Sequence, residues 1–310
     1  MKKLLYTLAL LISFVSYSQE SNLDWILTKM KNNSTEAYNI LKMYSDLPQK
    51  LSYASPGGSV TSTTKSSDAY FYLDLSSKKT TLNSMGTNVH EICHGLTSSY
   101  FYKEMKTNHV PHDFRDIGSY FYISEEIDYV SVFKGKVFPS SDLQNVIPKS
   151  LITSRYDTYI LGNNSTQGEG LIGLLNEFNA YYHGSKFDFD MLSVYKEIYP
   201  NDYLNEWVMN LQSEMTAFYE FDLWIKEYLI HAKYNYPSLY TVITDNSSVI
   251  DIYKAIHKKY KLLIEKYSSV VNFEKTKMKY NYKTEFWQDD YFKLIKELSN
   301  PKFDFINSLL

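Results

Sequence analysis

Two histidines and a glutamate stand at a spacing that suits metal chemistry: His90, Glu91 and His94 form an HExxH motif. The surrounding periodicity predicts a helix over about 84–106, and residues four apart on a helix lie on one face, one turn apart. Two imidazoles there reach one tetrahedral zinc ion, and Glu91 is placed to accept a proton from a water that the metal activates. The alternative interpretation is a solvated helix face with two unremarkable histidines.

A catalytic zinc needs a third protein ligand, which leaves one position open. The metzincin pattern HExxHxxGxxH is excluded because Tyr100 occupies the position of its third histidine. We expect Glu177 to be the third ligand, on a second helix over about 169–182 that ends at Gly184. Small residues share its face and would let this helix lie close to the first: Gly170, Gly173, Ala180 and Gly184. The alternative is a surface glutamate on an amphipathic helix.

Together the two elements resemble those of a zincin metallopeptidase of the gluzincin type, through HExxH at residues 90–94 and an NExxA-like element at 176–180. The resemblance covers the layout of about 68–184, with about ten specific residues. It implies that His90, His94 and Glu177 bind zinc and that Glu91 is the general base. Two departures stand out. Glu177 lies 83 residues beyond His94, which is long beside the thermolysin-like layout, and Tyr181 stands where an aspartate that orients a zinc-bound histidine often lies.

A hydrolase of this type also needs a donor for the tetrahedral oxyanion. Asn176 and Tyr181 are candidates for this role or for supporting the ligands. The wider set of possible donors is Tyr156, Tyr159, Tyr181, His183 and His231. Two further histidines, His109 and His112, are expected to be solvated, and Cys93 is expected to be a small buried residue.

The elements that position these residues follow from periodicity and turn composition. We expect helical structure over 21–46, interrupted near 32–34, then a loop over 47–67 and a strand over 69–75. The resemblance implies that this strand is a sheet edge above the cleft, where a peptide could add as a further strand; an ordinary sheet strand is the alternative. Two short strands follow at 120–123 and 129–138, then irregular chain over 139–168, and long helices at 202–233, 248–270 and 288–308.

The fold class expected is therefore α+β, with a zincin-like catalytic region over 19–190 and a helical C-terminal region over 191–310. Residues 1–18 have the positive start, apolar run and small residues of a cleaved signal peptide, which predicts a secreted or periplasmic protein without a stable membrane anchor. With 32 basic and 35 acidic residues, the chain carries no electrostatic footprint for nucleic acid.

These expectations lead to a secreted zinc metallopeptidase that hydrolyses peptide or protein substrates. The rival is an exported protein without enzymatic activity, which binds a peptide or glycan on a zincin-like scaffold. The 30 tyrosines would suit such a binding cleft, although a biased codon pool explains them as well.

Overall fold

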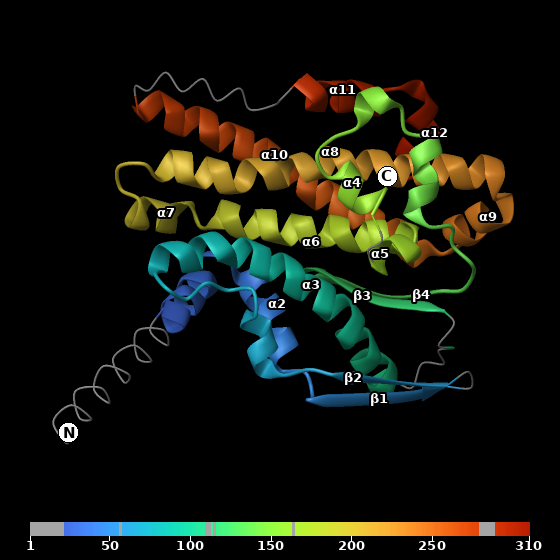
Figure 1. Ribbon diagram of the computed structural model, residues 1–310, viewed down its shortest axis with the longest axis horizontal. Coiled ribbons are helices and arrows are strands. Elements are labelled where there is room, and N and C mark those ends of the chain that lie inside the picture. Colours follow the sequence, from blue (N-terminus) through green and yellow to red (C-terminus); the bar gives the residue numbers. More distant parts are fainter. Residues whose placement is uncertain (1–21, 56–57, 109–112, 114–115, 163–164, 279–288) are drawn as a thin grey trace.

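The computed structural model describes residues 22–55, 58–108, 113, 116–162, 165–278 and 289–310 (Figure 1). This part of the chain is mostly helical and carries two small antiparallel sheets of two strands each. Both the helices and the sheets of the predicted α+β class are therefore present. The predicted signal peptide, His109 and His112 lie outside the described residues.

The N-terminal half contains both sheets and the helix that bears the HExxH motif. Residues 22–33 are helical, and the predicted interruption is confirmed because a second helix begins just after Ser34. The elements that follow are α2 (Thr35–Ser45), β1 (Lys50–Ser55), β2 (Gly58–Thr63), α3 (Lys78–Asn108), β3 (Ile117–Ser124) and β4 (Ile127–Phe133).

Short helices then lead into a long helical bundle. The short elements are 3-10 helices at Ser140–Asn145 and Lys149–Leu151, followed by α4 (Tyr156–Tyr159) and α5 (Ser165–Gly168). The bundle comprises α6 (Leu171–Asp190), α7 (Leu192–Ile198), α8 (Tyr203–Asn235), α9 (Pro237–Asp245), α10 (Ser247–Met278), α11 (Asp289–Leu298) and α12 (Asp304–Asn307), with a 3-10 turn at Pro301–Phe303.

Helix α6 is central, because it lies between α3 and α8 (Figure 1). Its apolar face carries Phe178, whose ring centroid lies 5.8 Å from that of Phe218 on α8 and 5.5 Å from that of Tyr260 on α10. One hydrophobic core therefore continues across the predicted domain boundary at residue 190. The C-terminal helices α8 and α10 therefore pack against α6 and support it.

Helix α3 begins earlier than periodicity predicted. Ser77 and Thr80 cap its first turn reciprocally: the Thr80 amide donates to Ser77 Oγ (3.2 Å) and the Ser77 amide donates to Thr80 Oγ1 (3.0 Å). Met85, Val89 and Leu96 form a buried apolar stripe along one face of this helix. This stripe fixes the rotation of α3 and turns the opposite face, with the two histidines, toward α6.

The strand predicted over 69–75 is wrong. Residues Ser66–Tyr70 form a 3-10 helix, and Phe71 is 75% exposed instead of buried. Side chains of α3 take up the backbone donors that a strand partner would need: the Tyr72 amide donates to Asn88 Oδ1 and the Asp74 amide to Ser84 Oγ. The expected edge strand for an added peptide is therefore absent at this position.

The loop predicted over 47–67 is also wrong in part, because β1 and β2 form a hairpin in which Lys50 pairs with Thr63 and Ser55 with Gly58. Serine and threonine hydroxyls face each other across it, as in the 3.1 Å contact between Ser52 and Thr61. The two strands predicted at 120–123 and 129–138 are present as β3 and β4, which pair antiparallel, but β4 ends at Phe133 and not at residue 138. Strand β3 is buried from Ser119 onward because helices cover it.

Candidate metal centre

The two histidines of the HExxH motif converge on one point. His90 and His94 lie one turn apart on α3, and their Nε2 atoms are 3.1 Å from each other. The His90 side chain is almost fully buried, whereas His94 is partly exposed to a cavity. Both rings therefore direct Nε2, a nitrogen that zinc commonly binds, toward the same small volume.

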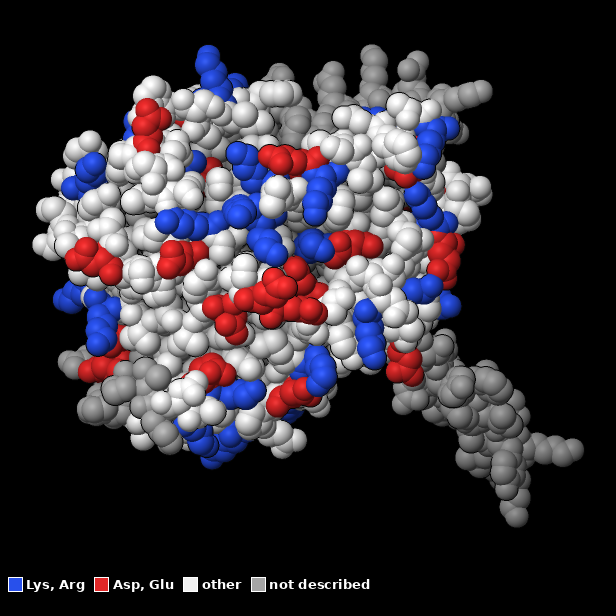
Figure 2. All heavy atoms as spheres, turned by 180° about the vertical axis from the view of Figure 1, so that it is seen from behind, with Lys and Arg blue, Asp and Glu red and all other residues white. Residues whose placement is uncertain are grey.

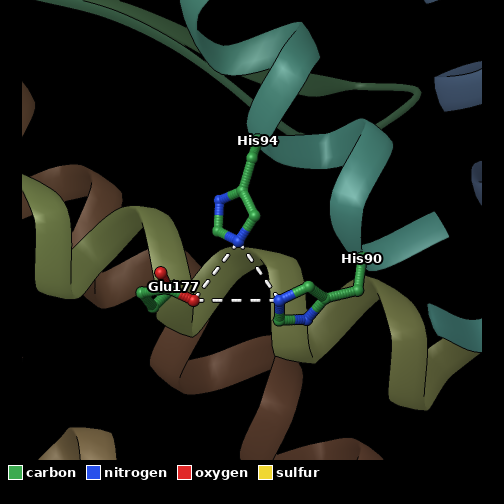
Figure 3. A group of neighbouring side chains, drawn as sticks. All are labelled: His90, His94 and Glu177. Atoms are coloured by element: carbon green, nitrogen blue, oxygen red, sulfur yellow. Dashed lines mark hydrogen bonds and ion pairs between the residues drawn. The ribbon is translucent and has the colours of Figure 1, made fainter. Parts of the chain in front are cut away.

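Glu177 reaches the same point from α6, as Figure 3 shows. Its Oε2 atom lies 3.2 Å from His94 Nε2 and 3.7 Å from His90 Nε2. Ligand atoms bonded to zinc at about 2.0–2.1 Å in a tetrahedron lie about 3.3 Å apart. The three observed separations are close to that edge length, so the donor set and its spacing fit a tetrahedral zinc ion with one position left for another group.

Glu177 Oε2 is also a buried atom that receives no hydrogen bond from the described residues. Its companion Oε1 is occupied, because Thr166 Oγ1 donates a hydrogen bond to it (3.0 Å). A buried carboxylate oxygen without a partner is costly. A cation placed between Oε2 and the two imidazoles would remove that cost, which is a second reason that these residues fit a metal ion.

Asn176 orients one of the imidazoles. Its Oδ1 lies 3.1 Å from Nδ1 of His94, so a proton on Nδ1 is donated to the amide oxygen and Nε2 is left as a lone pair for a metal. Metal-binding histidines usually have such a partner on the second nitrogen. Asn176, which precedes Glu177 on α6, thus orients His94 on the facing helix α3.

In the metal-free protein, the surroundings shift the pKa values of His90 and His94 in opposite directions. Burial, with smaller contributions from His94 and Arg155, lowers the pKa of His90 well below its usual value. Burial also lowers the pKa of His94, but the Glu177 carboxylate and Asn176 more than offset this, so the pKa of His94 is raised. His90 is therefore neutral at physiological pH, the form in which imidazole binds metals.

A cavity of about 500 Å³ opens beside the triad. It is lined by His90, Glu91, His94, Gly95, Ser98, Tyr159, Ser165, Thr166, Glu169, Asn176 and Glu177. Burial raises the pKa of Glu91, with His94 opposing and Glu177 reinforcing this effect. Glu91 thus lies in the cavity next to the metal-binding atoms and is not one of them. None of the strands that the structure describes contributes to this lining.

Among the possible oxyanion donors, Tyr159 and Asn176 line the cavity, and Asn176 is already engaged with His94. Tyr181 lies behind Tyr159: its hydroxyl is 3.0 Å from that of Tyr159, and its ring stands edge-on to His90 with centroids 4.5 Å apart. Tyr181 therefore packs against a candidate ligand without a hydrogen bond to it. His183 is buried elsewhere, where its Nε2 lies 2.7 Å from the Tyr122 carbonyl oxygen, and His231 lies beside Asn235 near the end of α8.

Two glycines explain how α6 approaches its neighbours, and they correct the expected packing. Gly184 does not end α6; a Cβ there would lie 3.2 Å from the Gly86 carbonyl oxygen on α3. Gly173 instead packs against α5, where a Cβ would lie 1.7 Å from the Thr166 carbonyl oxygen. The small-residue face therefore serves two contacts, and only its C-terminal part meets the HExxH helix.

The sequence did not single out Thr166, which lies 11 residues before the carboxylate that it supports and has no motif around it. The expected ligand set also did not include Glu169, which the structure places in the cavity wall. Burial raises the pKa of Glu169, His94 opposes this and Glu177 reinforces it. The glycines around Glu169 were the available signal, since they allow the preceding segment to fold back onto α6. Cys93 is buried as expected, 3.4 Å from Asn179 Nδ2.

Away from this centre, charges of both signs lie in adjacent groups on the face seen in Figure 2, and neither sign covers it. Within the described ranges, no helix is long and apolar enough to cross a membrane. Comparison of the chain with protein-family models, curated proteins and solved structures yields no significant match to any of them.

Proposed function

We propose that this protein is a zinc-dependent metallopeptidase with a zincin-like active site. The observation that carries the proposal is the convergence of His90 Nε2, His94 Nε2 and Glu177 Oε2 at 3.1–3.7 Å, with Oε2 buried and otherwise without a partner. Zinc held by these three atoms would polarise a scissile carbonyl and lower the pKa of a water.

Residues of the chain would then supply the proton transfer and the orientation of the ligands. Glu91 accepts the proton from the attacking water and passes it to the leaving amine. Burial raises the pKa of Glu91, which makes its carboxylate a stronger base. Asn176 holds His94 in the tautomer that leaves Nε2 free, and Thr166 holds Glu177 by its other oxygen.

Tyr159 is the proposed donor to the oxyanion. Tyr159 lines the cavity, and its hydroxyl lies 3.0 Å from that of Tyr181. With Tyr181 as the donor of this hydrogen bond, the Tyr159 proton would be available to the substrate. Burial and the nearby Glu177 raise the pKa of Tyr159, so the phenol stays protonated at neutral pH. The Arg155 guanidinium makes a cation–π contact with the Tyr181 ring, with its Cζ 4.8 Å from the ring centroid.

The decisive experiment pairs zinc content with turnover. The purified chain should hold one zinc and cleave casein or a peptide library, and a chelator should abolish cleavage. Glu91→Gln should retain the zinc and lose turnover, because the substitution removes the base and no ligand. Bound zinc without turnover on any peptide would instead favour a non-enzymatic peptide- or glycan-binding protein.

Export is a separate part of the proposal and depends on residues 1–18 alone. N-terminal sequencing of secreted protein should read from Gln19 onward. Secreted material that still begins with Met1 would refute the cleavage site.

A further inference from the structure

Glu169 is a carboxylate in the cavity wall that the proposed reaction does not use. It lies between α5 and α6 and lines the same cavity as Glu91 and Glu177. The metal-binding group of the described residues consists of His90, His94 and Glu177, so Glu169 is not a fourth ligand. Its side chain has no hydrogen bond or ion pair with another described side chain, although it is only partly exposed.

The cavity wall, as far as the structure describes it, holds no cation beside Glu169. Three carboxylates line the cavity, and none of the described lining residues is a lysine or an arginine. A zinc ion bound by Glu177 and two neutral imidazoles would retain one positive charge, which Glu91 balances. Arg155, a buried cation whose charge acts on His90, is already engaged, because it pairs with Glu220 at 2.6 Å. One negative charge, that of Glu169, therefore remains available to a ligand that enters the cavity.

We infer that Glu169 binds a positively charged nitrogen of the substrate and makes the cavity selective for cationic peptides. This inference rests on the proposed peptidase function and names its substrate class. A partly buried carboxylate gains most from a partner of opposite charge that enters the same water-poor space. The cationic group is either the α-amino terminus of a peptide or the side chain of a lysine or arginine close to the scissile bond.

The test measures binding apart from catalysis. The zinc-loaded Glu91→Asp protein, which keeps the negative charge at position 91 but shortens the base, is titrated with fluorescent peptides that carry lysine or acetyl-lysine at each position, with a free or an acetylated amino terminus. We expect the cationic members to bind at least about tenfold more tightly, as for a charge-assisted hydrogen bond in a partly buried site. Acetylation of the terminus and of the lysine separates the two sources of charge.

The matched variant is Glu169→Gln in the same background, which keeps the size of the side chain and removes its charge. Its zinc content should be unchanged and its preference for cationic peptides should disappear. Glu126→Gln, at an exposed position outside the cavity lining, is the control and should keep the preference. An equal preference in the Glu169→Gln protein, or no preference in the parent, would overturn the inference.

The outcomes for the two proposals remain distinct. If cationic peptides bind through Glu169 but the unmodified chain cleaves none of them, the peptidase proposal fails and the charge selectivity stands. If the unmodified chain cleaves peptides regardless of their charge, the peptidase proposal stands and the role of Glu169 is wrong.

Discussion

Gly173 and Thr166 are in such close contact that no larger residue fits at position 173: a Cβ there would lie 1.7 Å from the Thr166 carbonyl oxygen. This contact holds α5 against α6 and thereby brings the Thr166 hydroxyl to Glu177 Oε1. The candidate centre therefore depends on a backbone contact that involves none of its proposed ligands.

Gly173→Ala should displace α5 and weaken both the fold and the metal site. Overpacking of this kind costs roughly 1–3 kcal/mol of unfolding free energy, and zinc affinity should fall because Glu177 loses the Thr166 hydrogen bond. Urea unfolding and a zinc titration measure the two effects. Gly168→Ala is the matched control, since a Cβ at Gly168 meets no atom within 4 Å; equal behaviour of the two variants would contradict the proposed role of the contact.

Glu177→Ala should lower zinc affinity by orders of magnitude and abolish turnover, because it removes the only carboxylate of the triad. Glu169→Ala should retain zinc, although Glu169 lines the same cavity. A chromogenic chelator titration on both proteins compares them directly. Loss of zinc from the Glu169 variant, with retention in the Glu177 variant, would show that the ligand set is misassigned.

Asn176→Ala should lower zinc affinity by about 10–100-fold, the usual effect of removing the partner of a metal-bound histidine. Asn176→Asp keeps an acceptor oxygen for His94 Nδ1 and should retain most of the affinity. Competition with a chelator of known affinity provides the measurement. Equal losses in the two variants would mean that Asn176 does not act through His94.

Tyr159→Phe should keep the zinc and lower kcat by roughly 10²–10³, as for removal of one oxyanion donor. KM should change less, because the hydroxyl is expected to contact the substrate most strongly in the transition state. Tyr156→Phe, in the same short helix but outside the cavity lining, is the control. Unchanged kcat in the Tyr159 variant would remove Tyr159 from the mechanism.

The stability of the protein should fall as pH rises, because two buried carboxyl groups interact: Asp188 on α6 and Glu214 on α8. Burial raises the pKa of Glu214 to about 8, while burial and Glu214 raise that of Asp188 well above its usual value. An acid whose pKa is raised on folding stabilises the fold below its unfolded pKa, near 4.5 for Glu214, and this stabilisation is lost as pH rises through about 8.

Glu214→Gln should therefore stabilise the metal-free protein relative to the parent, increasingly so at high pH. We expect the difference in unfolding free energy between variant and parent to grow by at least about 1 kcal/mol from pH 5 to pH 9. Urea unfolding in a chelator across this range measures it, with Glu126→Gln, an exposed position, as the control. A difference that does not change with pH would refute the role of Glu214.

Local patterns predicted the helical elements well and the strands less well. The HExxH helix, the interruption near Ser34 and the long C-terminal helices all follow from apolar periodicity. The strand over 69–75 was wrong because Asn88 and Ser84 of α3 capture its backbone donors. Only the packed structure shows which hydrogen-bond partners are within reach, so an alternating pattern could not decide that segment.

For the candidate site, helix geometry was enough to predict that His90, Glu91 and His94 share one helical face. The small residues around Glu177 singled it out as a ligand candidate. Three features depend on tertiary packing: Glu177 Oε2 meets both imidazoles, Thr166 holds Glu177 while Asn176 holds His94, and Tyr159 and Glu169 line the cavity. These contacts join residues from separate elements, and their distances depend on how closely α3, α5 and α6 pack. That spacing is set by the shared core and by Gly173 and Gly184. The stripe of small residues predicted close packing of α6 but not which neighbour each glycine meets.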